Sequence, residues 1–317
     1  MKLFVTRRMT QAAEAALKAR FDVTIREETT GLTPAEAAQA MRDYDAILPT
    51  LGDGFTAAAF ADGPLRCKIL GNFGAGYNHI DIKAAAAAGV VVTNTPDVVT
   101  EATADIALTL ILMIARRASE GERLLRRGEW TGWQPTQLLG RHVSGCTVGI
   151  IGMGRIGKAI AQRCLHGFGM EVIFYNRSPV SALDIPARQV ESLGELMKQA
   201  DFAVVAVPGG PHTRHMIGEA ELAQLGRRSY LINIARGDIV EEAALIRALQ
   251  ENRIAGAALD VFEREPEVPE ALRVLENATL LPHLGTATEE VRTSMAMRAM
   301  ENLVAFDEGR ALRDRVN

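Results

Sequence analysis

The chain has 317 residues, of which 48 % are hydrophobic and 23 % charged, with a formal net charge of −4. This composition is typical of a soluble globular protein long enough for two compact domains, and without a basic block it excludes an extended nucleic-acid-binding surface. Three scattered cysteines exclude a disulfide framework or a zinc site, so we expect a reducing, cytoplasmic setting and no metal.

The first hundred residues alternate between short apolar runs, which predict strands, and alanine-rich helical patterns. Strands are predicted at 2–6, 23–27, 46–50, 68–72 and 90–95, and helices at 10–20 and 82–89. The N-terminal sequence MKLFVTRRM has no long apolar segment, so we expect no signal peptide. This alternation predicts a parallel sheet wrapped by helices.

A change of pattern near residue 100 separates a second unit from the first. Residues 100–128 predict one long helix, whose apolar run IALTLILMIA is too short to span a bilayer. A loop rich in Trp, Gly and Pro follows at 128–142. Six more strands are predicted at 147–152, 172–176, 202–207, 230–235, 257–261 and 279–282, and a final helix at 286–308. Periodicity leaves open whether that helix packs back on the first unit.

The segment GIIGMGRIG places Gly152, Gly154 and Gly157 in G-x-G-x-x-G spacing between an apolar strand and a helix. Gly152 permits the tight turn, Gly154 lets a pyrophosphate approach the backbone, and Gly157 lets the helix pack on the strand. The start of that helix, which includes Arg155 and Ile156, offers N–H groups to phosphates. The alternative is a glycine-rich turn without a ligand.

The segment FYNRSP follows the next strand, where a dinucleotide-binding fold usually carries an acid for the ribose 2′-hydroxyl. Here the residues are Asn176, Arg177 and Ser178. A carboxylate would repel a 2′-phosphate, whereas a guanidinium and a hydroxyl would bind it. We therefore expect NADPH/NADP⁺ to be favoured, with NADH/NAD⁺ possible. The alternative is a surface arginine in the turn before Pro179.

Three charged or titratable residues follow late strands of the second unit. Arg236 lies in NIARGD, His283 in LPHLGTAT and Glu265 in FEREPEVPE. Taken singly, each has a plain alternative: an arginine paired with Asp238, a structural histidine and a solvated acidic loop. Together they fit the reduction of a 2-keto acid, because Arg236 can bind a carboxylate, His283 can exchange a proton and Glu265 can orient the imidazole. A nicotinamide would supply the hydride.

Six motifs run along the chain: GNFGAGYNHIDI (71–82), TADIALTLILMIARR (103–117), VGIIGMGRIGKAIAQR (148–163), LINIARGDIVEEAAL (231–245), AALDVFEREP (257–266) and LPHLGTAT (281–288). In this order they resemble the D-isomer-specific 2-hydroxyacid dehydrogenase family over essentially the whole chain. The resemblance implies that Arg236, Glu265 and His283 form the catalytic triad.

The same resemblance implies an α/β fold of two Rossmann-like, doubly wound parallel-sheet domains with the active site in the cleft between them. The substrate-binding (catalytic) domain would comprise 1–98 and 286–317, and the dinucleotide-binding Rossmann domain 99–285. Further substrate contacts are implied for Leu51, Ala75 and Gly76. Further cofactor contacts are implied for Thr103, Pro208, Ala235, Asp260 and Gly285.

The segment GEWTGWQP resembles the glyoxylate/hydroxypyruvate reductase group of this family, which implies that Trp133 reaches the active site of a partner subunit in a homodimer. The alternative is a tryptophan buried in its own subunit. We expect NADPH-dependent reduction of glyoxylate or hydroxypyruvate, and no nucleic-acid or membrane partner. An NAD-linked dehydrogenase of the D-lactate or phosphoglycerate type, or a non-enzymatic dinucleotide-sensing protein, remains the alternative.

Overall fold

The computed structural model describes residues 1–61, 63–181 and 183–317, and the chain divides into two compact units, each described here by itself. One unit comprises Met1–Val99 and Thr286–Asn317, and the other Thr100–Gly285. In each unit helices pack on one main sheet, and all strand pairings within the two sheets are parallel. The predicted fold class, two parallel-sheet α/β units, is confirmed. Within the described ranges, no helix is long and apolar enough to cross a membrane.

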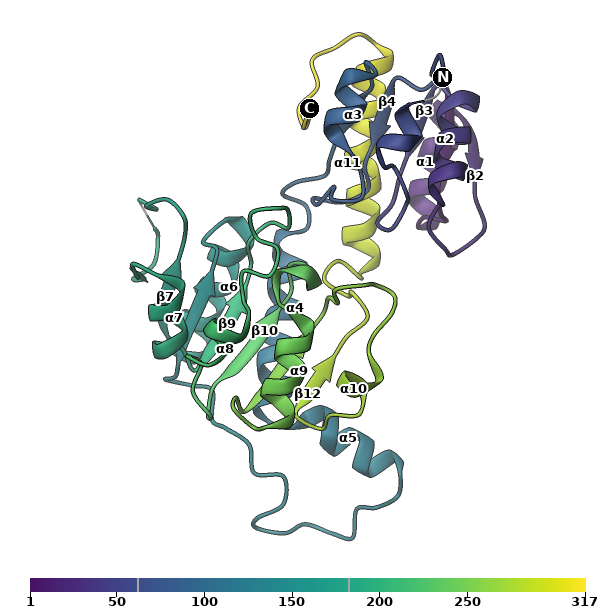
Figure 1. Ribbon diagram of the computed structural model, residues 1–317. Helices are drawn as coiled ribbons and strands as arrows, with labels where there is room; N and C mark the ends of the chain where they lie inside the picture. The colour runs from purple at the N-terminus through teal and green to yellow at the C-terminus, as the bar shows by residue number, and fades with distance from the viewer. Residues whose placement is uncertain (62, 182) are drawn as a thin grey trace. The chain divides into compact units, whose positions relative to one another are not determined.

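The first unit is built on five strands (Figure 1). Its elements are β1 (Lys2–Val5), α1 (Gln11–Arg20), β2 (Asp22–Ile25), α2 (Pro34–Asp43), β3 (Ala46–Leu48), the 3-10 helix η1 (Ala57–Phe60), β4 (Ile69–Gly71), α3 (Ile82–Ala87), β5 (Val91–Thr93) and α11 (Glu289–Asp307). The strand order is β2-β1-β3-β4-β5.

The strands of the first unit bury alternate side chains on opposite faces of the sheet, as period-2 geometry requires. Leu3 and Val5 pack with α1 and α11, whereas Phe4 packs with α2, η1 and α3. The question left open by periodicity is thereby answered, because Ala299 and Leu303 of the last helix pack on this sheet. Helix α2 begins with a complete capping box between Thr33 and Glu36, which satisfies two backbone N–H groups at its start.

The second unit is built on seven strands (Figure 1). Its elements are α4 (Thr100–Ala115), α5 (Ala118–Arg126), β6 (Thr147–Ile151), α6 (Arg155–Phe168), β7 (Glu171–Tyr175), β8 (Arg188–Gln189), α7 (Leu193–Gln199), β9 (Phe202–Val205), α8 (Glu219–Leu222), β10 (Tyr230–Asn233), the 3-10 helix η2 (Gly237–Ile239), α9 (Glu242–Gln250), β11 (Gly256–Leu259), α10 (Glu270–Arg273) and β12 (Ala278–Leu280). The strand order is β12-β11-β10-β9-β6-β7-β8.

Both faces of this sheet are covered, which explains the continuous apolar runs in its central strands. Val148 and Ile150 of β6 pack with α4 and α6, and Ile151 packs on the other face with α7, α8 and α9. Every predicted strand is present. The additional strand β8 has only two residues, Arg188 and Gln189, and so carries no hydrophobic pattern from which it could be predicted.

The single long helix predicted over 100–128 is wrong, because the chain breaks between α4 and α5. Arg117 adopts a left-handed conformation with φ of +50°, and its guanidinium pairs with Glu120 at 2.7 Å. The amide of Arg141 donates to the carbonyl of Ala115 at 2.7 Å and thus takes the place of a continuing helical turn. The apolar run predicted the helix but not this competition for its last carbonyl groups.

Candidate active site

The carboxyl ends of the parallel strands in the second unit position most of the predicted site residues. Open α/β sheets bind ligands at this edge, because turns there project side chains and helix N-termini into one region. Each of six strands is followed within three residues by a predicted site residue: Gly152 after β6, Asn176 after β7, Pro208 after β9, Arg236 after β10, Asp260 after β11 and His283 after β12.

The turn that carries Arg236 is held by Asn233, the last residue of β10. The buried Asn233 side chain donates to the carbonyl of Arg236 at 2.8 Å and accepts from the amide of Ala235 at 3.0 Å. The next residue, Gly237, lies so close to the Phe262 backbone that a Cβ would come within 1.8 Å of its carbonyl carbon. The turn after β10 therefore packs directly on the loop that carries Glu265.

Arg236 is a desolvated cation that forms no ion pair with any residue the structure describes. Burial lowers the pKa of its guanidinium, while the charges of Glu265 and Asp238 partly offset that effect. Its Nη1 donates to the carbonyl of Ala235 at 2.6 Å, and its buried Nε has no hydrogen-bond partner among the described residues. The alternative of a direct ion pair with Asp238 is not found in the described part of the chain. A buried donor without an acceptor is costly, so this arrangement fits an anionic ligand.

His283 and Glu265 form a direct pair, with 2.8 Å between Nδ1 and Oε2. The other oxygen, Oε1, accepts from the amide of Phe262 at 3.0 Å. Burial alone would raise the pKa of Glu265, but the hydrogen bond and charge of His283, the Phe262 amide and the charge of Arg236 together lower it. Because Nδ1 is engaged by the carboxylate, Nε2 is the ring nitrogen left for a reacting group.

Asp260 holds the backbone on which His283 sits. Its two carboxylate oxygens accept from the amides of Leu284 at 2.6 Å and Gly285 at 2.8 Å, and its carbonyl accepts from the amide of His283 at 2.9 Å. His283 itself has φ of +54°, a conformation that is uncommon for a residue with a side chain. Burial raises the pKa of Asp260, and the two amide bonds and the charge of His283 act against that rise.

Thr103, another predicted cofactor contact, lies beside Asp260 and Gly285. It is buried, and its hydroxyl donates to the carbonyl of Gly285 at 3.4 Å. Gly285 therefore lies between the side chains of Thr103 and Asp260. The start of α4 and the loop after β12 are joined here, beside the His283–Glu265 pair.

The glycine loop after β6 has the shape that a dinucleotide pyrophosphate requires. A Cβ on Gly157 would lie 2.1 Å from the carbonyl oxygen of Gly152, so close packing of α6 on the strand demands glycine there. A Cβ on Gly154 would meet no atom within 4 Å. Gly154 is also the N-cap of α6 and offers no side chain to the first-turn amides. The open space beside this helix start fits a phosphate group.

The residues after β7 leave a cation exposed at the same edge. Asn176 is turned toward its own loop, where its side chain donates to the carbonyl of Ser178 at 3.0 Å. Arg177 and Ser178 are exposed, and Arg177 forms no ion pair within the described ranges. No carboxylate is present in this turn. Both the predicted phosphate contact and a plain surface arginine are compatible with this geometry.

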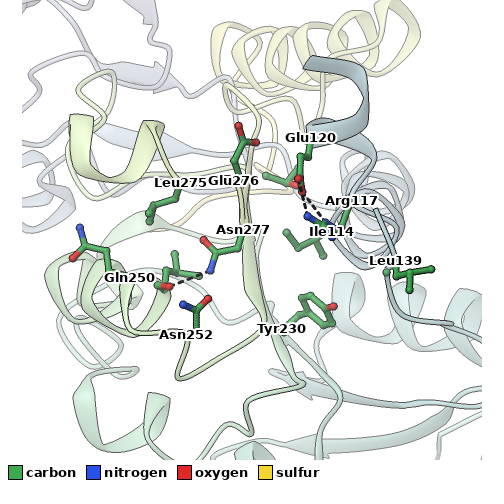
Figure 2. Close-up of a pocket in the computed structure, with 14 residues that line it drawn as sticks. Ile114, Arg117, Glu120, Leu139, Tyr230, Gln250, Asn252, Leu275, Glu276 and Asn277 are labelled. Carbon is green, nitrogen blue, oxygen red and sulfur yellow. Dashed lines mark hydrogen bonds and ion pairs between the residues drawn. The ribbon is translucent and has the colours of Figure 1, made fainter. Parts of the chain in front are cut away.

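A pocket of about 480 Å³ lies at the opposite edge of the sheet, near the amino ends of β10 and β12 (Figure 2). Two of its polar side chains already have partners: Arg117 pairs with Glu120 at 2.7 Å, and Asn277 donates to the backbone carbonyl of Leu249 at 3.1 Å. None of the predicted site residues lines this pocket. We therefore place the candidate active site at the carboxyl edge.

The remaining predicted site residues lie elsewhere. Trp133 is 80 % exposed in the loop between α5 and β6, and Leu139 of the same loop lines the pocket at the amino edge. Leu51, Ala75 and Gly76 belong to the first unit, in turns that follow β3 and β4. Their roles as substrate contacts stay predictions.

Sequence reasoning missed the residues that hold the site together. Asn233 ends an apolar strand, and a buried asparagine in that position is a signal for a side chain that caps a turn. A second histidine–carboxylate pair was also missed. Nε2 of His215 lies 2.9 Å from Oε1 of Glu263, and this pair joins the loop after β9 to the loop of Glu265. No pattern in the sequence indicates that pair.

Comparisons with known proteins identify the family to which this chain belongs. The model described as D-isomer specific 2-hydroxyacid dehydrogenase, NAD binding domain, matches residues 108–285. A glyoxylate reductase of Thermococcus gammatolerans is 42 % identical, with 97 % of this chain and 93 % of the relative covered. The corresponding protein of Pyrococcus furiosus is 40 % identical, with the same coverage.

Solved structures of related enzymes are also similar to this chain over nearly its whole length. An NADPH-dependent glyoxylate/hydroxypyruvate reductase from Sinorhizobium meliloti, in complex with NADP and malonate, superposes with a TM-score of 0.88 at 36 % identity, covering 99 % of this chain and 96 % of that one. A glyoxylate reductase from Paecilomyes thermophila gives a TM-score of 0.86 at 34 % identity, covering 100 % and 98 %.

Proposed function

The chain belongs to the D-isomer specific 2-hydroxyacid dehydrogenase family of oxidoreductases, and from that premise we propose that it reduces glyoxylate to glycolate with a nicotinamide dinucleotide. The observation that carries the proposal is the His283–Glu265 pair beside a desolvated Arg236 at the carboxyl edge of a dinucleotide-binding sheet. Hydroxypyruvate, which would give D-glycerate, is the second proposed substrate.

Each residue of the triad has a distinct task in this reaction. Arg236 binds the carboxylate of the keto acid through its guanidinium, whose buried Nε donates to no acceptor within the described ranges. Nε2 of His283 gives its proton to the carbonyl oxygen as the carbonyl carbon is reduced. Glu265 stays ionised, fixes the imidazole tautomer through Nδ1 and stabilises the imidazolium form. A nicotinamide bound beside these residues supplies the hydride.

The dinucleotide would be held along the same edge. The backbone around Gly152, Gly154 and Gly157, with the first turn of α6 at Arg155 and Ile156, would hold the pyrophosphate. Further contacts are proposed in the same unit: Thr103 at the start of α4, and Pro208, Ala235, Asp260 and Gly285 in the segments that follow strands.

NADPH is the proposed preference over NADH. Arg177 and Ser178 are exposed after β7, no carboxylate there would repel a 2′-phosphate, and the related Sinorhizobium meliloti enzyme is described as NADPH-dependent. Asn176 would contribute by ordering this turn, because it bonds the carbonyl of Ser178.

A homodimer is proposed from the distribution of exposed apolar side chains. Leu125, Trp130, Trp133 and Leu139 are each at least half exposed and lie on α5 and the loop that follows it. Single apolar residues scattered on a surface are normal, but a cluster on one segment, here α5 and the loop after it, is typical of an interface. The same segment of the partner subunit would bring its Trp133 to the substrate.

The test is a kinetic matrix of glyoxylate, hydroxypyruvate, pyruvate and phenylpyruvate, each with NADH and NADPH. We expect the highest kcat/KM with glyoxylate or hydroxypyruvate and NADPH, and loss of turnover in His283→Ala with cofactor binding retained. Absence of dinucleotide oxidation with every keto acid would refute the enzymatic proposal, and a preference for NADH with pyruvate would replace it by the D-lactate type.

A further inference from the structure

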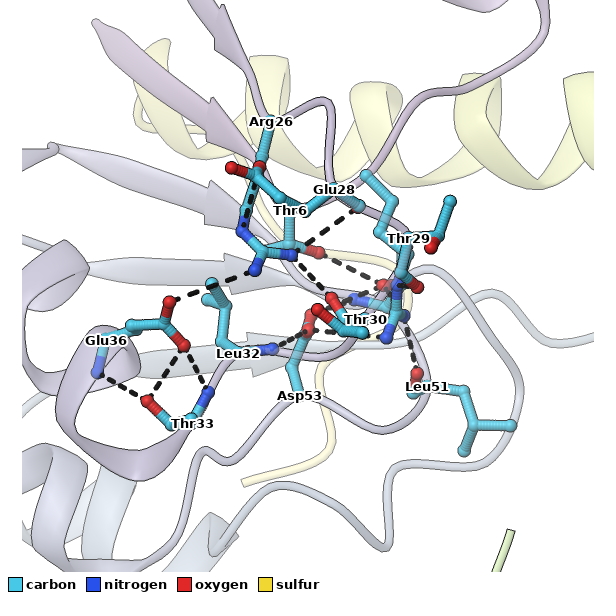
Figure 3. A network of polar contacts seen from close by, with 12 residues as sticks. Thr6, Arg26, Glu28, Thr29, Thr30, Leu32, Thr33, Glu36, Leu51 and Asp53 are labelled. Carbon is cyan, nitrogen blue, oxygen red and sulfur yellow. Dashed lines mark hydrogen bonds and ion pairs between the residues drawn. The ribbon is translucent and has the colours of Figure 1, made fainter. Parts of the chain in front are cut away.

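The loop that follows β3 in the first unit is held by a carboxylate with no exposed side-chain surface. The side chain of Asp53 is 0 % exposed. Its Oδ2 accepts from the amide of Thr50 at 2.7 Å and its Oδ1 from the amide of Leu32 at 2.9 Å. Figure 3 shows Asp53 and Leu32 facing each other across the two loops that they join.

Arg7, just beyond the end of β1, holds the same loop from its other side. Its Nη1 donates to the carbonyl of Leu51 at 2.6 Å and to the hydroxyl of Thr50, and its Nε donates to the carbonyl of Thr29 at 2.9 Å. Its Nη2 lies 3.9 Å from Oδ1 of Asp53. The Arg7 side chain is 22 % exposed, so most of it is enclosed by the loops that it binds.

Backbone contacts complete this Arg7–Asp53 clamp. The amide of Gly54 donates to the carbonyl of Leu32 at 2.7 Å, and Gly31 lies so close to Gly52 that a Cβ would come within 2.1 Å of the Gly52 oxygen. In Figure 3 the Leu51 side chain points away from the polar network, although its carbonyl belongs to it. The clamp therefore fixes a turn whose tip presents one exposed apolar side chain.

The clamp also reaches the loop FGAGY after β4. Thr50 pairs with Phe73 in an isolated parallel bridge, and the amide of Phe73 donates to the carbonyl of Pro49 at 2.9 Å. The following turn is closed by Asn72, whose side chain donates to the carbonyls of Gly74 and Gly76, each at 3.0 Å. A displacement of Thr50 would therefore also move Phe73 and the residues after it.

Stability alone is a weak reason for such an arrangement. The free energy needed to desolvate an ion pair is about as large as the attraction between its two charges. Proteins in which apolar residues replace such a pair are often equally stable. A buried carboxylate with several donors does fix one loop conformation. This clamp lies at the carboxyl edge of a parallel sheet, where ligands bind.

We propose that Arg7 and Asp53 are positioning residues that set the conformation of the 49–54 turn and the 73–76 loop, and thereby the affinity and size selectivity for the keto acid. This inference rests on the proposed function, in which Leu51, Ala75 and Gly76 contact the substrate. Arg7 and Asp53 act through those residues.

The test uses Arg7→Met, which keeps the length of the side chain but removes its donors, with Arg26→Met as the matched control. Arg26 is an arginine of the same unit with a side chain only 12 % exposed; it donates to the carbonyl of Thr30 and pairs with Glu36 at 3.8 Å. Within the described part of the chain it has no hydrogen bond to the 49–54 turn. Both variants lose contacts to the 28–32 segment, but only Arg7→Met also loses the hydrogen bonds to Thr50 and Leu51 in the 49–54 turn.

With NADPH saturating, Arg7→Met should raise the KM for glyoxylate about five- to tenfold, as expected for loss of one or two net hydrogen bonds, with kcat changed much less. The ratio of kcat/KM for glyoxylate over phenylpyruvate should fall, and Kd for NADPH should stay the same. Arg26→Met should keep all these values within about twofold. Arg7→Lys, which keeps the charge beside Asp53, should give an intermediate KM and serves as the test if Arg7→Met does not fold.

Hydrogen exchange supplies a readout that does not need activity. Amides of residues 50–55 and 73–76 should exchange faster in Arg7→Met than in Arg26→Met. Equal protection in both variants, or an unchanged KM and selectivity in Arg7→Met, would overturn the clamp. Lack of turnover in the unaltered enzyme would instead refute the proposed function, and hydrogen exchange would still decide whether Arg7 holds the two loops.

Discussion

Replacing Glu265 by glutamine removes one charge from the His283–Glu265 pair and keeps nearly the same side-chain shape. An amide oxygen can still accept from Nδ1, so the ring orientation is largely retained. What is lost is the carboxylate that favours the protonated imidazole. The pKa of Glu265 lies below its ordinary value of 4.5, so the carboxylate is ionised throughout pH 6 to 9 in the unaltered protein.

The size of the effect follows from the geometry. The paired atoms are 2.8 Å apart, and at a charge separation of about 4 Å with an effective dielectric of about 20, the attraction is about 4 kcal/mol. The two side chains are 30 % and 29 % exposed, so solvent screening reduces this to roughly 1–2 kcal/mol. Since about 1.36 kcal/mol corresponds to a factor of ten in rate, Glu265→Gln should lower kcat/KM for glyoxylate reduction about five- to thirtyfold.

The assay is kcat/KM for glyoxylate reduction with saturating NADPH, measured for the unaltered enzyme and for Glu265→Gln. Reduction needs the imidazole as a proton donor, so loss of the carboxylate that supports it should lower kcat/KM while Kd for NADPH stays the same. Glu263→Gln is the matched control, because that neighbouring carboxylate pairs with His215 instead. An unchanged kcat/KM in Glu265→Gln, or an equal loss in both variants, would refute the assigned role of Glu265.

The pair should also make stability depend on pH in a definite direction. Because folding lowers the pKa of Glu265, its contribution is fully present above the unfolded value and is lost as the pH falls through the lowered folded value. Glu265→Gln should therefore lower Tm clearly at pH 6, and the Tm difference should shrink as the pH falls below the ordinary Glu value of 4.5. A Tm difference that grows as the pH falls through this range would contradict this sign.

Two further substitutions test separate parts of the site. Arg177→Ala should weaken NADPH binding by roughly 1.5–3 kcal/mol, or about ten- to a hundredfold, with a much smaller effect on NADH; equal losses in fluorescence titrations would remove the 2′-phosphate role. Asp260→Asn places an amide where the backbone N–H groups of Leu284 and Gly285 need acceptors, so Tm should fall by roughly 2–10 °C in calorimetry, together with kcat. An unchanged Tm would show that these bonds do not hold the loop of His283.

The positions of the site residues were predictable to the extent that they depend on strand ends. Arg236 and His283 follow apolar strands of one parallel sheet, and such ends meet at one edge. Glu265 is different, because charge pattern alone cannot separate it from Glu263 and Glu267 in the same acidic loop. Only the family motif selected it. The structure supplies the physical reason: Glu263 is turned to His215, and Glu265 to His283.

Contacts that join distant segments were beyond sequence reasoning. The break after α4 depends on an amide 26 positions away in the chain, Arg141, reaching the carbonyl of Ala115. The conformation of His283 likewise depends on the carboxylate of Asp260, which follows another strand. Such contacts have no local period, and a hydrophobic pattern therefore predicts the elements but not the polar side chains that fix the turns between them.

The three glycines of the loop after β6 look equivalent in the sequence, yet the structure separates them and yields a sharp test. A Cβ on Gly157 would lie 2.1 Å from the Gly152 oxygen, whereas a Cβ on Gly154 would meet nothing within 4 Å. Gly157→Ala should therefore lower Tm strongly, and Gly154→Ala should leave Tm within about 2 °C, because an exposed helix start tolerates alanine. If a pyrophosphate packs against Gly154, the same harmless methyl group should weaken NADPH and NADH alike by about tenfold or more. Unchanged binding of both dinucleotides in Gly154→Ala would mean that this loop does not hold the pyrophosphate, however well its spacing matches.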